Sequence, residues 1–173
     1  MFKPGEYIHY GSSGLCRVEE ITKLNVSGAD KDRLYYRLSP MEGQGGVIYT
    51  PVDNQKVQMR RELSTEEAKQ LIDSIPDIQE LWISEEKQRE QNYKQALKSP
   101  DCRCWIQIIK TLYLRKQSRM AQGRKITATD EKYLKSAENR LYSELALALG
   151  QDKSDMEQYI TMRIKSLETA GAK

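Results

Sequence analysis

The sequence has few of the residues on which most enzymes and secreted proteins depend. Its 173 residues include one histidine, three cysteines and one phenylalanine. An odd, small number of cysteines does not suit a disulfide framework and is typical of a reducing compartment. The chain has no apolar run of membrane-spanning length, and its first residues lack the apolar stretch of a signal peptide. We therefore expect a cytoplasmic protein that makes no membrane contact.

The residues that could carry catalysis or hold a metal stand apart from suitable partners. His9 lies in an expected strand, and no orienting carboxylate accompanies it and the nearby serines. Cys102 and Cys104 form only half of a zinc-binding pattern, which would need a second pair. We expect these two cysteines to pack beside Trp105. The sequence predicts no catalytic residue, no metal site, no cofactor and no small-molecule substrate.

Up to Arg61 the pattern is that of short β-strands. Segments rich in Tyr, Val and Ile alternate with turn residues, and Leu34, Tyr36 and Leu38 can share one face of a strand. Four or five strands in about 60 residues predict a small, strongly bent antiparallel barrel of the SH3 or Tudor kind. The expected strands cover residues 6–10, 15–24, 34–38, 47–52 and 57–59.

Beyond the strands the pattern becomes helical. Ser64, Thr127 and Ser154 each precede an acidic residue by three positions, which is the spacing of a capping box. Asp101 can cap the helix that follows it. Gly150 can end the helix expected at 128–149. We expect five helices, with a candidate break in the second near residue 84, at 64–74, 77–98, 101–121, 128–149 and 154–168.

The fold class that follows is α+β. A small antiparallel β barrel occupies residues 1–61, and an all-helical domain of about five helices occupies residues 62–173.

The charges are unevenly distributed along the chain, although the net charge is only +3. Residues 62–86 contain eight acidic side chains and one lysine, whereas residues 87–140 contain 14 Lys or Arg and five acids. A dense positive block predicts a surface that binds a polyanion. The alternative, which composition alone favours, is a set of solvated helix faces.

Four stretches of the sequence are recognisable together: FKPGEYIHYGSSGLCRVEEI from residue 2, YKQALKSPD from residue 93, IIKTLYLRKQSRMAQGRKITATDEKYLKSAE from residue 108, and LYSELALALG from residue 141. They resemble the CarD/CdnL family of bacterial RNA-polymerase-binding regulators. The first module of that family is shared with the polymerase-interacting domain of the transcription-repair coupling factor. The resemblance covers nearly the whole chain, in the order expected for both halves of the family.

The resemblance implies that the β module docks on the RNA polymerase β subunit. Main-chain pairing between two sheet edges would supply the affinity, and side chains at alternate positions would tune it. Some family members have a basic residue where this chain has Tyr49, which would make an aromatic contact instead. The segment that matches the docking strand is Val47, Ile48, Tyr49, Thr50, Pro51 and Val52.

The resemblance also implies that the helical domain contacts promoter DNA at the upstream edge of the melted region. A tryptophan wedge in the minor groove would hinder closing of the DNA. Trp82 is the candidate wedge because it precedes the basic helix, whereas Trp105 lies on an apolar stripe. Flanking Leu81 and Ile83 leave open the alternative that Trp82 packs between helices. The candidate phosphate contacts are Lys87, Arg89, Lys94, Lys98, Lys110, Arg115, Lys116, Arg119, Arg124, Lys125 and Lys132.

Three functions stay open on the sequence. The first is a non-enzymatic bridge that stabilises the promoter open complex, with polymerase and promoter DNA as partners. The second is an architectural DNA-binding protein that needs no polymerase. The third is a protein-protein adaptor whose basic helices form only a solvated surface.

Overall fold

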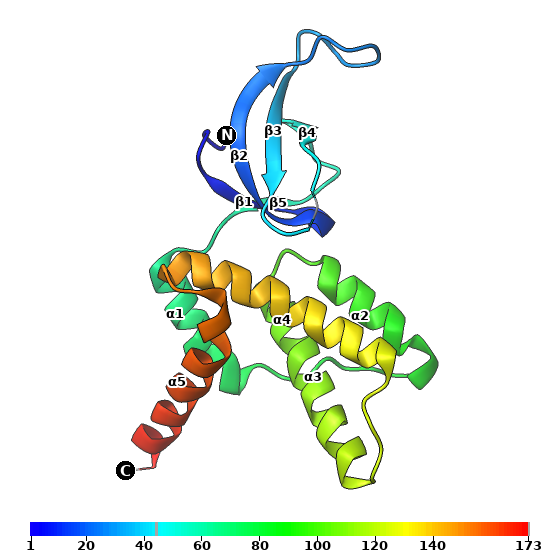
Figure 1. Ribbon diagram of the computed structural model, residues 1–173, viewed down its shortest axis with the longest axis vertical. Coiled ribbons are helices and arrows are strands. Elements are labelled where there is room, and N and C mark those ends of the chain that lie inside the picture. The colour runs from blue at the N-terminus through cyan, green and yellow to red at the C-terminus, as the bar shows by residue number, and fades with distance from the viewer. Residues whose placement is uncertain (44, 173) are drawn as a thin grey trace. The chain divides into compact units, whose positions relative to one another are not determined.

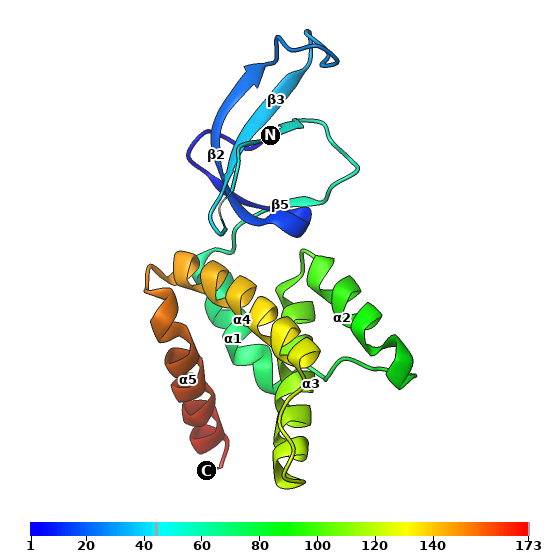
Figure 2. The ribbon, with the colours of Figure 1, turned by 45° about the vertical axis from the view of Figure 1, so that its right-hand side comes forward.

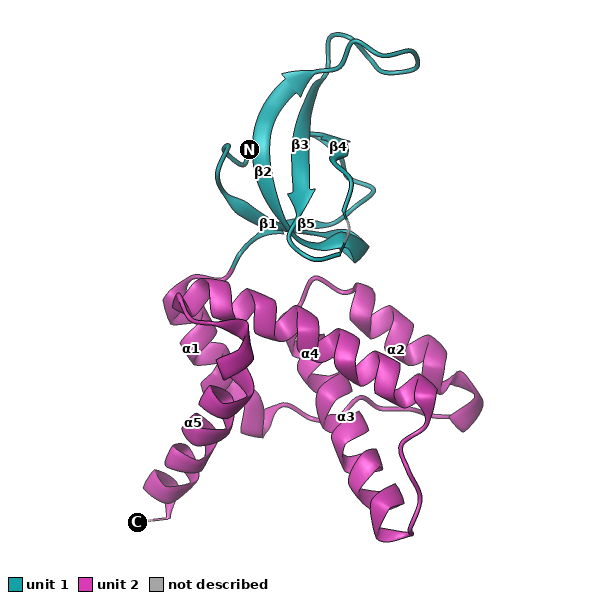
Figure 3. Cartoon of the chain, viewed as in Figure 1, with its two compact units in different colours: residues 1–62 teal, residues 63–173 magenta. Residues whose placement is uncertain are grey.

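The computed structural model describes residues 1–43 and 45–172, which form two compact units, Met1–Glu62 and Leu63–Lys173 (Figure 3). The first unit consists of strands and the second of helices (Figure 1). The predicted α+β class is confirmed, because a five-stranded antiparallel sheet is followed by five α-helices in this part of the chain. None of these helices is both long and apolar enough to cross a membrane.

The sheet of the first unit has the strand order β4-β3-β2-β1-β5, so β4 lies at one edge and, among the described residues, pairs with β3 alone. Strand β2 pairs with β1 on one side and β3 on the other, and its register shifts between Val18 and Glu20. Such an irregularity bends a strand and increases its twist. The strands are β1 (Tyr7–Tyr10), β2 (Gly14–Lys23), β3 (Leu34–Pro40), β4 (Ile48–Pro51) and β5 (Met59–Arg61).

A small apolar core lies on one side of this sheet. Tyr36 and Leu38 of β3 are buried in it together with Ile8 of β1, as the period of two predicts. The hydroxyl of Tyr36 accepts the main-chain N–H of Phe2 at 2.9 Å, which ties the start of the chain to the sheet. Leu34 departs from the prediction, because it stands at the beginning of β3 and is exposed.

The helical unit is organised around two long helices, α3 and α4, which pack against each other (Figures 1 and 2). Helix α2 packs on both of them, and α1 and α5 pack on α4 and on each other. Trp105, Leu112 and Leu145 are fully buried between the long helices. The helices are α1 (Thr65–Ser74), α2 (Arg89–Lys98), α3 (Cys102–Ala121), α4 (Ala128–Leu149) and α5 (Met156–Gly171).

Three of the predicted helix ends are confirmed. The Ser64 hydroxyl accepts the N–H of Glu67 at 3.2 Å, and the Glu67 carboxylate accepts the N–H of Ser64 at 2.8 Å, which completes a capping box at α1. Asp101 caps α3 by accepting the N–H of Arg103 at 2.9 Å. Gly150 ends α4 in the left-handed region, with a φ of 62°, which glycine adopts without steric cost.

Two predicted helix boundaries are wrong. The helix expected at 77–98 begins only at Arg89, because the chain leaves α1 through a 3₁₀ turn, Ile75–Asp77, and then runs irregularly to residue 85. Ser154 does not cap α5, because it lies inside another 3₁₀ turn, Lys153–Asp155, and α5 starts after that turn without a side-chain cap.

Candidate functional site

Strand β4 offers a free edge with exposed side chains. Tyr49 lies opposite Arg37 of β3 and is 47% exposed, and Val47 just before the strand is 44% exposed. Thr50 is buried, and its hydroxyl accepts an N–H from the Asn54 side chain at 2.8 Å, which fixes the inner face of the strand. An edge of this kind suits the addition of a strand from a partner. The other candidates of this segment are half-buried: Ile48, Pro51 and Val52.

The two tryptophans have opposite environments. Trp82 is 82% exposed, whereas Trp105 is completely buried and donates its indole N–H to the carbonyl of Ser99 at 3.1 Å. Trp82 lies in the irregular chain between α1 and α2, which we call the Trp82 segment (residues 76–88). Its neighbours Leu81 and Ile83 are partly buried against the helical core. The exposure of Trp82 does not fit the alternative in which this side chain packs between helices.

Side chains of α3 bind the main chain of the Trp82 segment. The Lys110 ammonium donates to the carbonyl oxygens of Pro76 at 3.3 Å and Ile78 at 2.6 Å. The Thr111 hydroxyl accepts the N–H of Leu81 at 2.8 Å. These bonds satisfy three main-chain groups of the segment, the carbonyls of Pro76 and Ile78 and the N–H of Leu81, without a helix.

An ion-pair cluster holds the end of the Trp82 segment. Arg115 pairs with Asp130 and with Glu86, each at 2.8 Å. Glu86 also pairs with Arg89 at 3.1 Å, and Arg89 donates to the hydroxyl of the buried Tyr93. Burial by itself raises the pKa of Glu86, but the charges of Arg89 and Arg115 outweigh it and hold this pKa below its usual value. Asp130 is only 2% exposed, so the cluster has a buried anchor.

The loop between α3 and α4 carries two exposed cations, Arg124 and Lys125. It returns along α3 to the start of α4 (Figures 1 and 2). Its course is fixed by Arg119, whose carbonyl accepts the N–H of Arg124 at 2.8 Å and whose side chain donates to the carbonyl of Lys125 at 2.8 Å. Gly123 makes the turn with a φ of 72°.

The candidate phosphate contacts therefore differ in how free they are to bind a phosphate. Lys87, Lys98, Arg124 and Lys125 are exposed and have no ion-pair partner among the residues that the structure describes. Lys94 and Lys132 are exposed as well, but Lys94 pairs with Glu90 at 3.5 Å and Lys132 lies 5.7 Å from the ring centre of Tyr133. Lys116 is half-buried. The cations that donate to partners inside the unit are Arg89, Lys110, Arg115 and Arg119.

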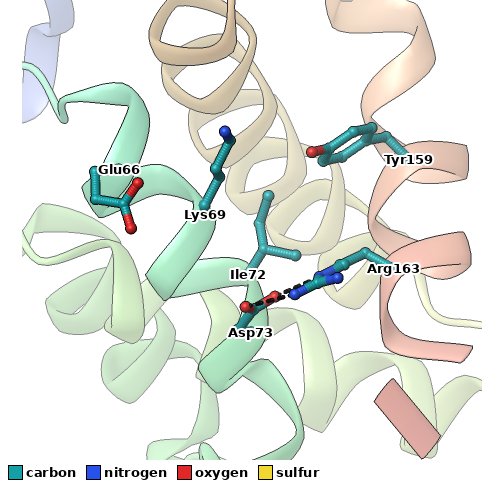
Figure 4. Close-up of a pocket in the computed structure, with 6 residues that line it drawn as sticks. All are labelled: Glu66, Lys69, Ile72, Asp73, Tyr159 and Arg163. Atoms are coloured by element: carbon teal, nitrogen blue, oxygen red, sulfur yellow. Dashed lines mark hydrogen bonds and ion pairs between the residues drawn. The ribbon is translucent and has the colours of Figure 1, made fainter. Parts of the chain in front are cut away.

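A separate hollow of about 370 Å³ lies between α1 and α5 (Figure 4). Asp73 and Arg163 form a two-bond ion pair across it, at 2.7 and 2.8 Å, and this hydrogen bonding lowers the pKa of Asp73. Its walls carry two acids and two bases, so the hollow lacks the positive field that attracts a polyanion. The residues that line it are Glu66, Lys69, Ile72, Asp73, Tyr159 and Arg163.

His9 and Cys102 are both buried. His9 is 1% exposed within the sheet, and Cys102 is buried with its thiol 3.5 Å from the carboxylate of Glu144. In residues 1–43 and 45–172, no group of three or more His, Cys, Asp or Glu side chains is arranged to hold a metal ion.

Two known families match the chain, one on each compact unit. The family described as the CarD-like/TRCF RID domain matches residues 2–62. The family described as the CarD C-terminal domain matches residues 70–161, which is more than half of the chain. A comparison with curated proteins finds no match.

Proposed function

This chain belongs to the CarD-like family of transcription-associated proteins that interact with RNA polymerase, and from that premise we propose that it bridges polymerase and promoter DNA. Its β unit docks on the polymerase β subunit. Its helical unit contacts DNA at the upstream edge of the melted region and stabilises the open complex. The observation that carries the proposal is the 82% exposure of Trp82, on a segment bound to a basic helix.

The docking step uses the free edge of β4. A strand of the β subunit pairs with the main chain of residues 47–52, and the exposed Tyr49 contributes an aromatic contact. The inner face of β4 stays in place during docking, because Thr50 is buried and hydrogen-bonded to Asn54.

The DNA step combines a wedge with a few phosphate contacts. The Trp82 indole enters the minor groove at a partly unstacked base step, so the DNA strands re-pair more slowly. Lys87, Arg124 and Lys125 contact phosphates, because they are exposed and form no ion pair with a carboxylate of residues 1–43 or 45–172. Phosphate contacts fix position without reading bases, so the proposed binding has little sequence specificity.

The test measures the lifetime of promoter open complexes after competitor DNA is added, with the full chain present. Trp82→Ala should shorten this lifetime and leave the affinity for polymerase unchanged, because the two contacts lie on different units. Tyr113→Ala is the matched control, since Tyr113 is also an exposed aromatic but stands two residues beyond Thr111, off the face that binds the Trp82 segment. An unchanged lifetime with Trp82→Ala contradicts the proposal.

A second candidate is an architectural DNA-binding protein that acts without polymerase, which the exposed cations of the α3–α4 loop favour. Tight, salt-dependent binding to bare duplex DNA would support it. Weak binding that becomes tight only with polymerase supports the bridge.

A further inference from the structure

We propose that Lys110, Thr111 and Arg115 are positioning residues that hold the Trp82 segment on α3 and fix the direction of the exposed indole. The inference rests on the proposed contact of Trp82 with DNA. It gives Lys110 and Arg115, two cations of the sequence-predicted DNA surface, a role inside the protein instead.

The Trp82 segment needs such support because it has no regular structure of its own between residues 78 and 85. An exposed side chain on a free segment would sample many orientations, and each contact it makes would first have to order that segment. A segment held in one conformation avoids this ordering cost on binding. Holding the segment orients Trp82 in particular, because Leu81 and Ile83 pack against the core whereas the Trp82 side chain is exposed.

The attachments lie on both sides of Trp82 along the chain. Thr111 binds the N–H of Leu81, the residue just before it, and Arg115 binds the carboxylate of Glu86, four residues after it. Thr111 and Arg115 are one turn apart on α3 and therefore share a face of the helix. Lys110 adds a third attachment further upstream, at the carbonyl of Ile78.

The Thr111 hydroxyl uses both of its hydrogen-bonding capacities. It donates to the carbonyl of Gln107 at 2.7 Å and accepts the N–H of Leu81 at 2.8 Å. Valine has nearly the shape of threonine but neither capacity, whereas serine keeps both. This position therefore offers a near-isosteric loss of the bond and a matched variant that retains it.

Arg115 can hold Glu86 because its own guanidinium is fixed by the buried Asp130. Asp130 is 2% exposed and binds Nε of Arg115, and Nη2 of the same guanidinium binds Glu86. The Glu86 side chain is 65% exposed, and its place is set by its ion pairs with Arg115 and with Arg89, which begins α2. With these two edges of the guanidinium occupied, Arg115 is poorly placed to clamp a phosphate.

The first measurement is amide hydrogen exchange in the full chain. Thr111→Val should speed exchange at the Leu81 amide by about five- to tenfold, because one hydrogen bond is lost. Thr111→Ser should stay close to the wild type. Equal exchange at Leu81 in all three proteins overturns the proposal.

The second measurement is open-complex lifetime in a double-mutant cycle. Thr111→Val should shorten the lifetime when Trp82 is present and have no further effect in the Trp82→Ala background, because it acts through the indole. If Trp82→Ala shortens the lifetime and Thr111→Val does not, the positioning role is wrong and the proposed function stands. If Trp82→Ala itself has no effect, the proposed function fails and the positioning role falls with it.

Lys110→Met keeps the proposal testable if Thr111→Val does not fold. It retains the aliphatic stem and removes the ammonium that binds the segment. With Lys110→Met, the slope of log affinity for DNA against log salt concentration should stay unchanged. Arg124→Met should lower the magnitude of this slope by about 0.9, because one phosphate contact is lost. An equal loss of slope with Lys110→Met would mean that Lys110 contacts phosphate, which overturns its positioning role.

Discussion

The contrast between the two tryptophans gives a prediction about stability. Trp105→Ala removes a side chain that is completely buried in the core of the helical unit, and deletions of this kind cost about 3–5 kcal/mol. Trp82→Ala removes a side chain that is 82% exposed, and substitutions at such positions usually change stability by less than about 0.5 kcal/mol.

The assay is thermal unfolding of the full chain, followed by far-ultraviolet circular dichroism of the helices. One kcal/mol shifts the Tm of a domain of this size by roughly 4–8 °C, so Trp105→Ala should lower the Tm of the helical unit by more than about 12 °C. Trp82→Ala should lower it by no more than about 4 °C. The two units are separately compact, so the transition of the helical unit is taken from the helical signal alone.

An equal loss of Tm in both variants would refute the reasoning. It would mean that the Trp82 indole is packed in solution, and a side chain that is packed in the core cannot also enter DNA. The wedge would then have to be a different residue, or the helical unit would contact phosphates only.

Two further predictions follow from the edge strand and from the hollow between α1 and α5. Tyr49→Glu should weaken binding to the polymerase β subunit in a pull-down of the full chain while the Tm stays unchanged, because Tyr49 is exposed on β4; undiminished binding would place the docking surface elsewhere. Asp73→Asn should lower the Tm at neutral pH and lose this effect in acid. The hydrogen bond from Arg163 lowers the pKa of Asp73, so the stabilisation is present above the usual carboxyl pKa of about 4 and is lost as the pH falls through the lower value of the folded state. A Tm difference that does not depend on pH would contradict this account.

The parts of the fold that could be predicted from the sequence depend on short-range interactions. The capping box of Ser64 and Glu67, the cap at Asp101 and the terminating Gly150 each involve residues a few positions apart, so their spacing is visible in the sequence. The strand pattern before Arg61 depends on a period of two and is equally local.

The Trp82 segment could not be predicted in the same way. Its main chain is bound by Lys110 and Thr111, about thirty residues further along, and no local pattern records such bonds. The capping box expected at Thr127 forms only in part for a similar reason. Thr127 accepts the N–H of Asp130 at 3.2 Å, but the Asp130 carboxylate binds Arg115 instead.

Contacts between residues distant in the sequence also limit what a count of charges can say about DNA binding. Arg115 and Arg124 contribute equally to the basic block, yet one is paired with a buried carboxylate and the other is exposed. On the proposed function, only the exposed cations neutralise phosphates, and each of them adds a modest, salt-dependent gain in affinity. Docking of the β unit on polymerase would then raise the local concentration of the helical unit at the promoter, so weak contacts become sufficient there and stay insufficient on other DNA. A held tryptophan with few free cations is therefore suited to a protein that relies on polymerase, rather than on base sequence, to find its site.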